Sequence, residues 1–345
     1  MRAMVYEKFR ERPMVRGVPS PSCPPAGAII RVQATGLCRS DWHAWMGHDD
    51  DVTVPHVPGH ELAGTLAEVG PEVTGWRIGD RVTTPFVCAC GSCERCRAGD
   101  HQVCDRQTQP GFTHWGSFAE LVAIEHAEVN LVRVPDGVDI ATAASLGCRF
   151  ATAYRAVVAQ GRVHDGAWVA VHGCGGLGLS AVMIAAARGA QVVAVDVTGP
   201  ALELARRAGA TVVVDGSAEP DVAAAVRDAT GGGAHVSIDA LGCTTTFQNS
   251  LRGLRKRGRH VQAGLLLAEH ATQAVAMGPV VANELEILGS HGMAAHDYPP
   301  MLAEIAAGTL RPELLIGREL TLEDGVDALL AMSHGSPAGV TILRP

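Results

Sequence analysis

Four cysteines in one short segment have the spacing of a metal site. Cys90, Cys93, Cys96 and Cys104 follow the pattern Cys-x2-Cys-x2-Cys-x7-Cys. Four thiolates at such short intervals suit a closed tetrahedral zinc site, which stabilises the fold and has no open coordination position. An iron–sulfur cluster is the alternative, although the spacing is not that of the ferredoxins. The pattern predicts a structural zinc, with the neighbouring Cys88 outside the ligand set.

Three residues from distant parts of the chain form a second candidate set. Cys38, His60 and Cys148 supply two sulfurs and one nitrogen. These are the donors of an open catalytic zinc, which keeps its fourth position for water or a substrate oxygen. Spacing alone does not establish this site, because the residues converge only if the fold brings them together. His60 by itself is more simply explained as an ordinary buried or surface histidine.

A glycine-rich segment points to dinucleotide binding. Residues 173–178 read Gly-Cys-Gly-Gly-Leu-Gly and fit G-x-G-x-x-G. The glycines of this motif permit a tight turn, a close approach to a pyrophosphate and close packing of a helix on a strand. The N-terminus of that helix presents free N–H groups to the phosphates. The candidate cofactor-binding residues here are Gly173, Gly175, Gly176, Leu177 and Gly178. A glycine-rich turn in another α/β fold is the alternative.

An acidic residue after the next predicted strand indicates which dinucleotide is bound. Asp196 ends that strand, and no Arg or Lys lies between it and Glu203. A carboxylate at this position accepts hydrogen bonds from the ribose hydroxyls of NAD and repels the 2′-phosphate of NADP. The sequence therefore favours NAD over NADP.

Two regions with different sequence patterns must position these residues. Up to about residue 148, short β-like runs are broken by Gly and Pro, which predicts an all-β, barrel-like unit. These runs are Ala28–Val32, Leu62–Val69, Asp80–Val82 and Phe118–Val122. From about residue 149, apolar strands alternate with Ala-rich helices, as in βαβ units with a parallel sheet. The expected strands are Ala167–His172, Gln191–Asp196, Thr211–Asp215, His235–Asp239, Arg259–Gly264 and Leu285–Ser290.

These patterns predict an α/β protein with two domains. Six strands in two βαβαβ halves indicate a doubly wound Rossmann domain over residues 149–290. The tail, residues 291–345, has one predicted helix, Tyr298–Ala307, and is too short to fold alone. We expect it to return to the first unit, so that residues 1–148 and 291–345 form one domain.

Composition excludes several classes of protein. The chain has 345 residues, of which 47% are hydrophobic and 19% charged, so we expect a folded protein with a substantial core. The formal net charge is −8 and the longest basic run is Arg255-Lys256-Arg257, which argues against nucleic-acid binding. Charged residues at the N-terminus argue against a secretory signal. The uncharged run 166–187 has a strand-turn-helix pattern, so we expect a cytoplasmic protein that does not contact a membrane.

Taken together, the motifs resemble those of the zinc-containing medium-chain dehydrogenase/reductase family, the alcohol dehydrogenases. The resemblance covers almost the whole chain, in order. It rests on Gly-x-Cys-Arg-Ser-Asp-x-His over residues 36–43, Gly59-His60-Glu61, the four-cysteine segment, Gly-Cys-x-x-x-Thr-Ala-Tyr over residues 147–154, and the glycine-rich segment. It implies a GroES-like β-barrel catalytic domain, a Rossmann domain, one catalytic and usually one structural zinc, and NAD or NADP.

The resemblance also implies roles for single residues. Ser40 matches the hydroxyl that hydrogen-bonds the substrate oxygen, and His43 the distal end of a proton relay. Glu61 matches an acid that can approach the metal, and Asp41 the carboxylate that holds the histidine ligand. Arg39 and Thr152 match contacts to the cofactor pyrophosphate and nicotinamide, and Phe86 and Phe118 match the substrate pocket. Ser40 also fits a plain helix cap near Asp41.

Three details bear on the substrate. Trp115, with Trp42 and Trp45, lies near the predicted ligand loops and favours an apolar or aromatic pocket, although ordinary core positions would also explain these residues. Cys148 as third ligand argues against a sugar-alcohol substrate, because polyol dehydrogenases often carry a carboxylate there. Arg149 places an unexpected charge beside the metal or the cofactor.

The resulting prediction is an NAD-dependent zinc alcohol dehydrogenase. It would interconvert a primary or secondary alcohol and the aldehyde or ketone, as a homodimer or homotetramer. An aldehyde reductase or a specialised biosynthetic dehydrogenase of the same family is the first alternative. A non-enzymatic, zinc-stabilised NAD-binding protein is the second, but it gives no reason for Cys38, His60 and Cys148 to occur together.

Overall fold

The computed structural model describes residues 1–267, 270–335 and 337–345. These residues form two compact units. The first contains Met1–Ala151, Gly292–Gly308 and Ile316–Pro345, and the second contains Thr152–His291 and Thr309–Leu315. The tail therefore returns to the first unit except for His291 and Thr309–Leu315, which belong to the second, whereas the sequence placed the whole tail in the first.

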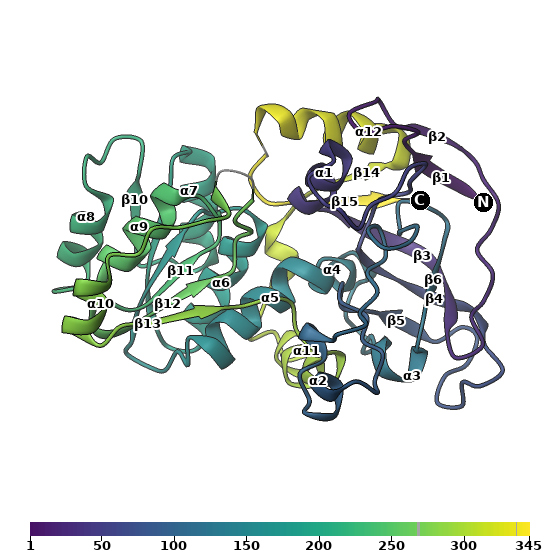
Figure 1. Cartoon of the computed structure of the whole chain (residues 1–345), viewed down its shortest axis with the longest axis horizontal. Coiled ribbons are helices and arrows are strands. Elements are labelled where there is room, and N and C mark those ends of the chain that lie inside the picture. Colours follow the sequence, from purple (N-terminus) through teal and green to yellow (C-terminus); the bar gives the residue numbers. More distant parts are fainter. Residues whose placement is uncertain (268–269, 336) are drawn as a thin grey trace. The chain divides into compact units, whose positions relative to one another are not determined.

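The first unit is built on a seven-stranded sheet. Its order is β14-β15-β3-β4-β5-β7, with β6 also paired to β3. The strands are β3 (Ala28–Leu37), β4 (Glu61–Val69), β5 (Arg81–Thr83), β6 (Leu121–Ile124), β7 (Val132–Arg133), β14 (Ile316–Thr321) and β15 (Val340–Arg344), and β1 (Arg2–Val5) and β2 (Met14–Gly17) form a separate hairpin. Figure 1 shows the C-terminal β15 beside the N-terminal β3, with which it pairs antiparallel.

Short helices and turns connect these strands and carry much of the candidate site. They are α1 (Arg39–Met46), α2 (Glu94–Arg97), α3 (Ala127–Asn130), α4 (Ile140–Ala144), α11 (Tyr298–Ala306) and α12 (Leu322–Ala331), with single turns η1 (His101–Val103), η2 (Leu146–Phe150), η5 (Ala295–Asp297) and η7 (Met332–His334). The sequence missed α12. Helix α1 begins at Arg39, two residues before the start near Asp41 that the sequence predicted, because Cys38 rather than Ser40 is the N-cap.

The second unit contains a six-stranded sheet in which every neighbouring pair is parallel. Its order is β10-β9-β8-β11-β12-β13. The strands are β8 (Trp168–His172), β9 (Gln191–Asp196), β10 (Val212–Asp215), β11 (Ala234–Asp239), β12 (Leu254–Gln262) and β13 (Glu286–Gly289). All six strands predicted from the sequence are confirmed, with β12 beginning earlier than expected, and the strand order is that of a doubly wound Rossmann sheet.

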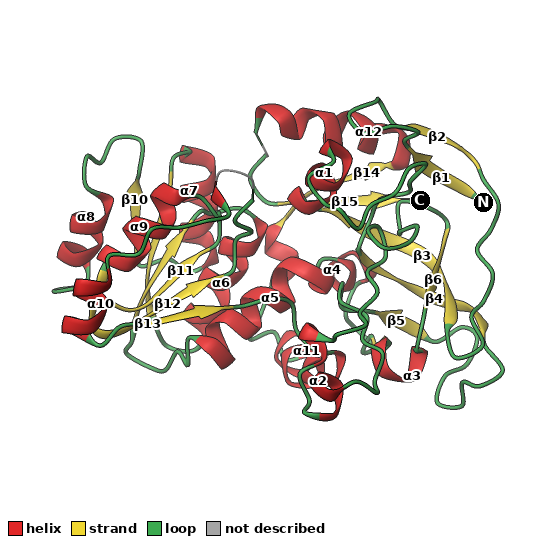
Figure 2. Cartoon of the chain, viewed as in Figure 1, coloured by secondary structure: helices red, strands yellow, loops and turns green. Residues whose placement is uncertain are grey.

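Helices flank this sheet (Figure 2). They are α5 (Ala151–Arg155), α6 (Gly176–Ala187), α7 (Gly199–Ala208), α8 (Val222–Ala229), α9 (Thr244–Arg252) and α10 (Met277–Asn283), with single turns η3 (Ala156–Gln160) and η6 (Pro312–Leu315). Apolar residues of the strands and helices form a buried core that includes Ala170, Val193, Val222 and Val226. The central strands β8, β9 and β11 are mostly buried and are near-continuous apolar runs, which is why the sequence revealed them.

Candidate active site and metal centres

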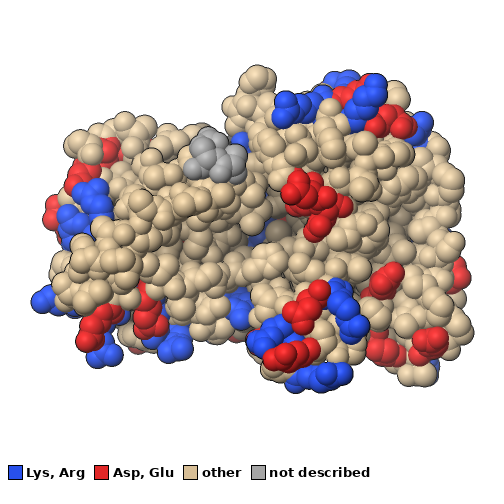
Figure 3. All heavy atoms as spheres, viewed as in Figure 1, with Lys and Arg blue, Asp and Glu red and all other residues tan. Residues whose placement is uncertain are grey.

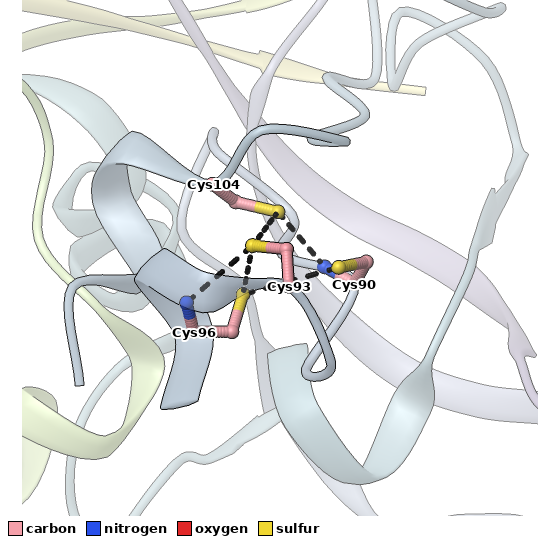
Figure 4. A group of neighbouring side chains, drawn as sticks. All are labelled: Cys90, Cys93, Cys96 and Cys104. Carbon is pink, nitrogen blue, oxygen red and sulfur yellow. Dashed lines mark hydrogen bonds between the residues drawn. The ribbon is translucent and has the colours of Figure 1, made fainter. Parts of the chain in front are cut away.

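The four-cysteine segment folds into a compact lobe in which all four thiols converge (Figure 4). Cys93 Sγ lies 3.4 Å from Cys96 Sγ and 3.7 Å from Cys104 Sγ, and Cys90 Sγ lies 4.0 Å from Cys96 Sγ. A tetrahedral zinc with Zn–S bonds of about 2.3 Å requires sulfurs about 3.8 Å apart. The lobe therefore has the dimensions of a closed four-thiolate zinc site.

Backbone and side-chain donors around the lobe favour thiolates. The backbone N–H of Ser92 and the guanidinium of Arg106 donate to Cys90 Sγ at 3.5 and 3.4 Å. The Ser92 N–H is the main cause that lowers the pKa of Cys90 to about 5. The backbone N–H of Cys96 donates to Cys93 Sγ at 3.4 Å. These donors favour the thiolate form of Cys90 and Cys93, which is the form that binds a metal, whereas burial raises the pKa of Cys96 and Cys104.

The structure also brings together the three distant ligands. Cys38, His60, Glu61 and Cys148 each offer a donor atom within 4.8 Å of the others. Cys38 follows β3, and His60 precedes β4. The antiparallel register that pairs Gly36 with Glu61 sets these two ligands side by side. Cys148 comes from the π-helical turn η2, a rare conformation that is often found at functional sites.

His60 is oriented as a metal ligand. Its ring is fully buried, and its Nδ1 lies 2.9 Å from Asp41 Oδ1. Asp41 is held in turn by the backbone N–H groups of Cys38 and Gly59, at 2.8 and 3.1 Å. With Nδ1 occupied, Nε2 is left buried without a hydrogen-bond partner among the described residues. Such an orphaned nitrogen beside two thiols fits a zinc ion, and a carboxylate on the other ring nitrogen is its usual support.

The guanidinium of Arg149 forms an ion pair with the carboxylate of Glu61. Glu61 Oε1 accepts from the backbone N–H and from Nε of Arg149, both at 2.9 Å, and Glu61 Oε2 accepts from Nη2. Both side chains are buried. Burial raises the pKa of Glu61, and the facing Arg149 charge opposes that rise. For Arg149, burial is the largest single influence and lowers the pKa, but the charge and hydrogen bonds of Glu61 together with the charges of Cys38 and Cys148 outweigh it, so the net pKa is raised.

Helix α1 carries three further candidates. Ser40 Oγ lies 3.9 Å from Cys38 Sγ, so its hydroxyl is next to the metal ligands. His43 is half-buried, and its Nδ1 lies 3.1 Å from Nδ1 of His48. Burial first, then the charges of Arg39 and His48, lower the pKa of His43 to about 4. Arg39 stacks over the ring of Trp42 at 4.2 Å and donates to the carbonyl of Met332.

The glycine-rich segment forms the turn between β8 and α6 in the second unit. Gly173 has a φ of 89°, in the left-handed region that favours glycine. A side chain at Gly178 would lie 1.8 Å from the carbonyl oxygen of Gly173, so only glycine fits. Gly175, Gly176 and Leu177 lie at least partly exposed at the start of α6, where their backbone is accessible.

Asp196 is positioned against this turn. Its Oδ2 accepts from the backbone N–H of Cys174 at 2.7 Å, and its Oδ1 accepts from the N–H and hydroxyl of Thr198, both at 2.9 Å. The carboxylate is thus fixed at the carboxyl end of β9, beside the glycines. Thr152 is buried in α5 of the same unit.

Two aromatic rings lie against His60. The ring centroids of Phe86 and Phe112 are 6.2 and 5.2 Å from that of His60. The sequence named Phe86 but missed Phe112, for which it carries no local signal. Phe118 is instead fully buried in the core cluster with Met4 and Leu37, and Trp115 packs with Ala3, Val5, Val57 and Ala119. Phe112 is buried in the same core cluster as Phe118, and it is the one of the two whose ring contact with His60 is recorded. The assignment of Phe86, Trp115 and Phe118 to a substrate pocket stays a prediction.

A β-sheet unit with a zinc lobe and a three-donor metal site, together with a Rossmann unit, defines a zinc-binding dehydrogenase. Comparison with known proteins agrees. Residues 24–136 match the alcohol dehydrogenase GroES-like domain, and residues 176–307 match the zinc-binding dehydrogenase domain. The chain belongs to the zinc-containing medium-chain dehydrogenase/reductase family, whose members are oxidoreductases.

Relatives cover the full length of the chain. An alcohol dehydrogenase of Geobacillus stearothermophilus is 33% identical over 96% of both chains, and an NAD-dependent alcohol dehydrogenase of Sulfurisphaera tokodaii is 31% identical over 100% of both. The solved alcohol dehydrogenase TADH from Thermus sp. ATN1 has a TM-score of 0.91 and 30% identity, covering 100% of this chain and 99% of that one.

The surface charge is mixed in sign. On the face drawn in Figure 3, acidic and basic side chains are interspersed, without a continuous basic surface. Within the described residues, no helix has the length and apolar composition needed to cross a bilayer.

Proposed function

We propose that the protein is an NAD-dependent zinc alcohol dehydrogenase that interconverts an alcohol and its aldehyde or ketone. The observation that carries the proposal is the orphaned Nε2 of His60. It is buried within 4.8 Å of the thiols of Cys38 and Cys148, while the opposite ring nitrogen is held by Asp41. Two sulfurs and one nitrogen leave a zinc ion one open position, which a structural site does not need.

Cys38, His60 and Cys148 would hold the catalytic zinc, and Cys90, Cys93, Cys96 and Cys104 the structural one. When bound, zinc supplies Lewis-acid polarisation of an alcohol or carbonyl oxygen, and NAD supplies the hydride acceptor. The chain's residues handle the proton. Ser40 Oγ, next to Cys38, is the group that accepts the proton of the substrate hydroxyl.

His43 and Glu61 have separate parts in this proposal. Because burial lowers the pKa of His43 to about 4, its imidazole is neutral near pH 7, and a proton that reached this ring would pass on to solvent rather than stay there. Glu61 contributes negative charge beside the metal ligands, and its carboxylate is paired with the guanidinium of Arg149. Arg39 is the group of the first unit that we assign to the cofactor pyrophosphate, since a guanidinium matches phosphate geometry.

The second unit supports NAD rather than NADP. Asp196 is fixed beside the glycine turn, where its charge repels a 2′-phosphate. A zinc-binding dehydrogenase from Sinorhizobium meliloti, 26% identical with a TM-score of 0.88, was solved bound to NADP, so membership of the family alone does not decide the cofactor. Gly173, Gly175, Gly176, Leu177 and Gly178 would hold the pyrophosphate, and Thr152 would lie at the nicotinamide.

The rings of Phe86 and Phe112 beside His60 favour an apolar or aromatic substrate, primary or secondary. We further propose a cytoplasmic homodimer or homotetramer.

The test is the initial rate of reduced-cofactor formation with primary, secondary, benzylic and polyol substrates, using NAD and NADP in parallel. We expect NAD-dependent oxidation of one apolar class. Cys38→Ala should abolish turnover and leave NAD affinity unchanged, because the glycine turn belongs to the other unit. Cys23→Ala, a thiol outside both metal sets, is the matched control and should retain activity. The proposal would be contradicted if Cys38→Ala retained turnover. It would also be contradicted if the zinc-loaded wild-type protein oxidised none of the substrates.

A further inference from the structure

One guanidinium joins the three segments that carry the catalytic ligands. Arg149 directly follows Cys148, and its Nε and Nη2 bond the carboxylate of Glu61, which directly follows His60. Its Nη1 donates to the carbonyl oxygen of Leu37 at 3.0 Å, and Leu37 directly precedes Cys38. Each partner of Arg149 is therefore the immediate neighbour of a different ligand.

The fold leaves a space that this ion pair fills. A side chain at Gly36 would lie 2.2 Å from Glu61 Oε2 and 2.8 Å from Arg149 Nη2, so glycine is required for the pair to form. Gly36 is paired with Glu61 across β3 and β4. The carboxylate and guanidinium are thus built into the sheet, and both are buried.

Glu61 has a second possible partner. Its carboxylate lies within 4.8 Å of the donor atoms of Cys38, His60 and Cys148, so it is a potential fourth ligand. Carboxylate oxygens bind zinc readily, and a fourth protein ligand would close the position that a substrate needs. Arg149 occupies both oxygens of the carboxylate in a two-pronged contact, the strongest type of ion-pair hydrogen bonding.

We infer that Arg149 is a positioning residue that holds the Glu61 carboxylate out of the ligand set and keeps the fourth coordination position open. The inference rests on the function proposed above and extends it to a residue outside the ligand set. Charge supports it: the Arg149 guanidinium is the positive group paired with the buried Glu61 carboxylate, so without Arg149 the metal becomes the nearest cation to that carboxylate.

The test uses the holoenzyme with cobalt(II) exchanged into the three-ligand site and zinc retained in the four-cysteine lobe. Imidazole, a neutral ligand for the open position, is titrated against the visible spectrum of cobalt, without substrate or NAD. The variants are Arg149→Met, Arg149→Met with Glu61→Gln, and Arg149→Lys. Arg81→Met is the matched control, because Arg81 lies in the same unit and donates only to the carbonyls of Pro135 and Val138.

We expect the wild type and Arg81→Met to bind imidazole alike. Arg149→Met should bind it about tenfold more weakly or worse, with an altered spectrum, because the carboxylate occupies the position. Adding Glu61→Gln should restore binding, since an amide is a poor zinc ligand and still accepts from the backbone N–H of residue 149. Arg149→Lys keeps the positive charge but not the two-pronged hydrogen bonding, so its affinity for imidazole should be intermediate. This variant tests the inference if Arg149→Met does not fold.

Wild-type affinity in Arg149→Met or in Arg149→Lys would overturn the inference. Failure of Glu61→Gln to restore binding in the double variant would also overturn it, because the effect would then come from general distortion. A wild-type protein that takes no cobalt in the three-ligand site would overturn the proposed function as well, so the two failures are distinguishable.

Discussion

Asp41 and Glu61 are both fully buried carboxylates next to the same metal ligand, but their partners give them different roles. Asp41 accepts from two backbone N–H groups and from the His60 ring, so it fixes the orientation of a ligand. The carboxylate of Glu61 forms an ion pair with the guanidinium of Arg149. A buried carboxylate beside a metal thus needs an assigned partner, because an unpaired one would compete for the metal.

At the same scale, we predict that the choice between NAD and NADP depends on Asp196. Replacing Asp196 with Gly and Thr198 with Arg removes the carboxylate that repels a 2′-phosphate and adds a cation that binds it. We expect the ratio of kcat/KM for NAD to that for NADP to fall at least about tenfold, because one charged hydrogen bond is worth about 1.5–3 kcal/mol. Steady-state kinetics with both cofactors at a fixed alcohol concentration measure the ratio.

The chain provides a matched control for that experiment on the neighbouring strand. Asp215 pairs with Asp196 in register and accepts from the N–H and hydroxyl of Ser217, as Asp196 does from Thr198. Asp215→Gly with Ser217→Arg should leave the ratio unchanged. An equal change in both double variants would mean that net charge, and not contact with the ribose, controls the choice.

Residue types that are rare outside metal sites were predictable, and their partners were not. The seven cysteine and histidine residues that the structure brings into two clusters were predicted from the sequence because their types, spacing and order resemble those of a known family's metal ligands. The partner of Arg149 was not, since Glu61 lies 88 residues away and only the fold pairs them. The contact between Phe112 and His60 was missed for the same reason, because the two residues lie 52 positions apart in the chain.

At the scale of elements, the four-cysteine lobe should act as a separate stabilising unit. Only the short helices α2 and η1 lie within its segment, so we attribute much of its rigidity to the metal. Cys93→Ser should release one zinc per chain and lower the melting temperature by roughly 5–10 °C, because losing a structural metal site removes several kcal/mol. Calorimetry and zinc analysis test this.

The kinetics of the surviving enzyme complete that prediction. Since four thiolates leave the metal of this site no open coordination position for a substrate, kcat of the folded fraction should stay close to the wild-type value. Cys23→Ser, at a thiol outside the lobe, should keep both zincs and the wild-type melting temperature. A Cys93→Ser protein that melts normally but has lost turnover would contradict a structural role for the lobe.

Strand β8 carries a histidine whose protonation opposes folding. His172 is fully buried, and within the described chain neither ring nitrogen has a hydrogen-bond partner. Burial, with a smaller effect from His260, lowers the pKa of His172 to about 3. The unfolded value is about 6.5. Because the folded pKa is the lower one, stability is fully present above pH 6.5 and is lost as pH falls towards 3.

Acidification from pH 8 to pH 5 should therefore cost about 2 kcal/mol through His172 alone. We expect His172→Leu to reduce the loss of unfolding free energy over this range by that amount, measured by urea unfolding at both pH values. His164→Leu, at an exposed position of the same unit, should behave like the wild type. Identical pH dependence in His172→Leu and His164→Leu would contradict the assignment. Because both variants retain the metal ligands, acid release of zinc cancels in the comparison.

Helices and strands were predicted correctly where burial imposes a regular pattern of apolar residues on the sequence. Strands β8, β9 and β11 of the second unit are apolar runs because they are mostly buried, and their limits follow within a few residues. Helix α12 was missed because it contains Gly325, although Thr321 and Asp324 form a cap that signals its start. Gly325 is required by packing, since a side chain there would lie 2.8 Å from Leu343. Long-range packing, which sequence periodicity does not show, overrode helix propensity.

For the molecule as a whole, the second unit has a surface suited to self-association. Strand β13 is the edge of the six-stranded sheet and pairs only with β12 among the described strands. Its Ile287 is 40% exposed, and helix α10, which has no buried residue, exposes Met277 at 55% and Val281 at 71%. An edge strand with unpaired N–H and C=O groups beside apolar side chains is disposed to pair with a second copy.

We therefore predict that the protein is a dimer or tetramer and that Ile287→Lys with Val281→Asp lowers its mass in solution by one association step, measured by light scattering at constant concentration. A lysine on an edge strand opposes strand pairing, and an aspartate replaces exposed apolar surface with charge. Ile78→Lys is the control, because Ile78 is 70% exposed but lies outside the strands of the first unit. It should leave the mass unchanged. If the double variant keeps the wild-type mass, association uses another surface, and the exposed α10 and β13 side chains need a different explanation.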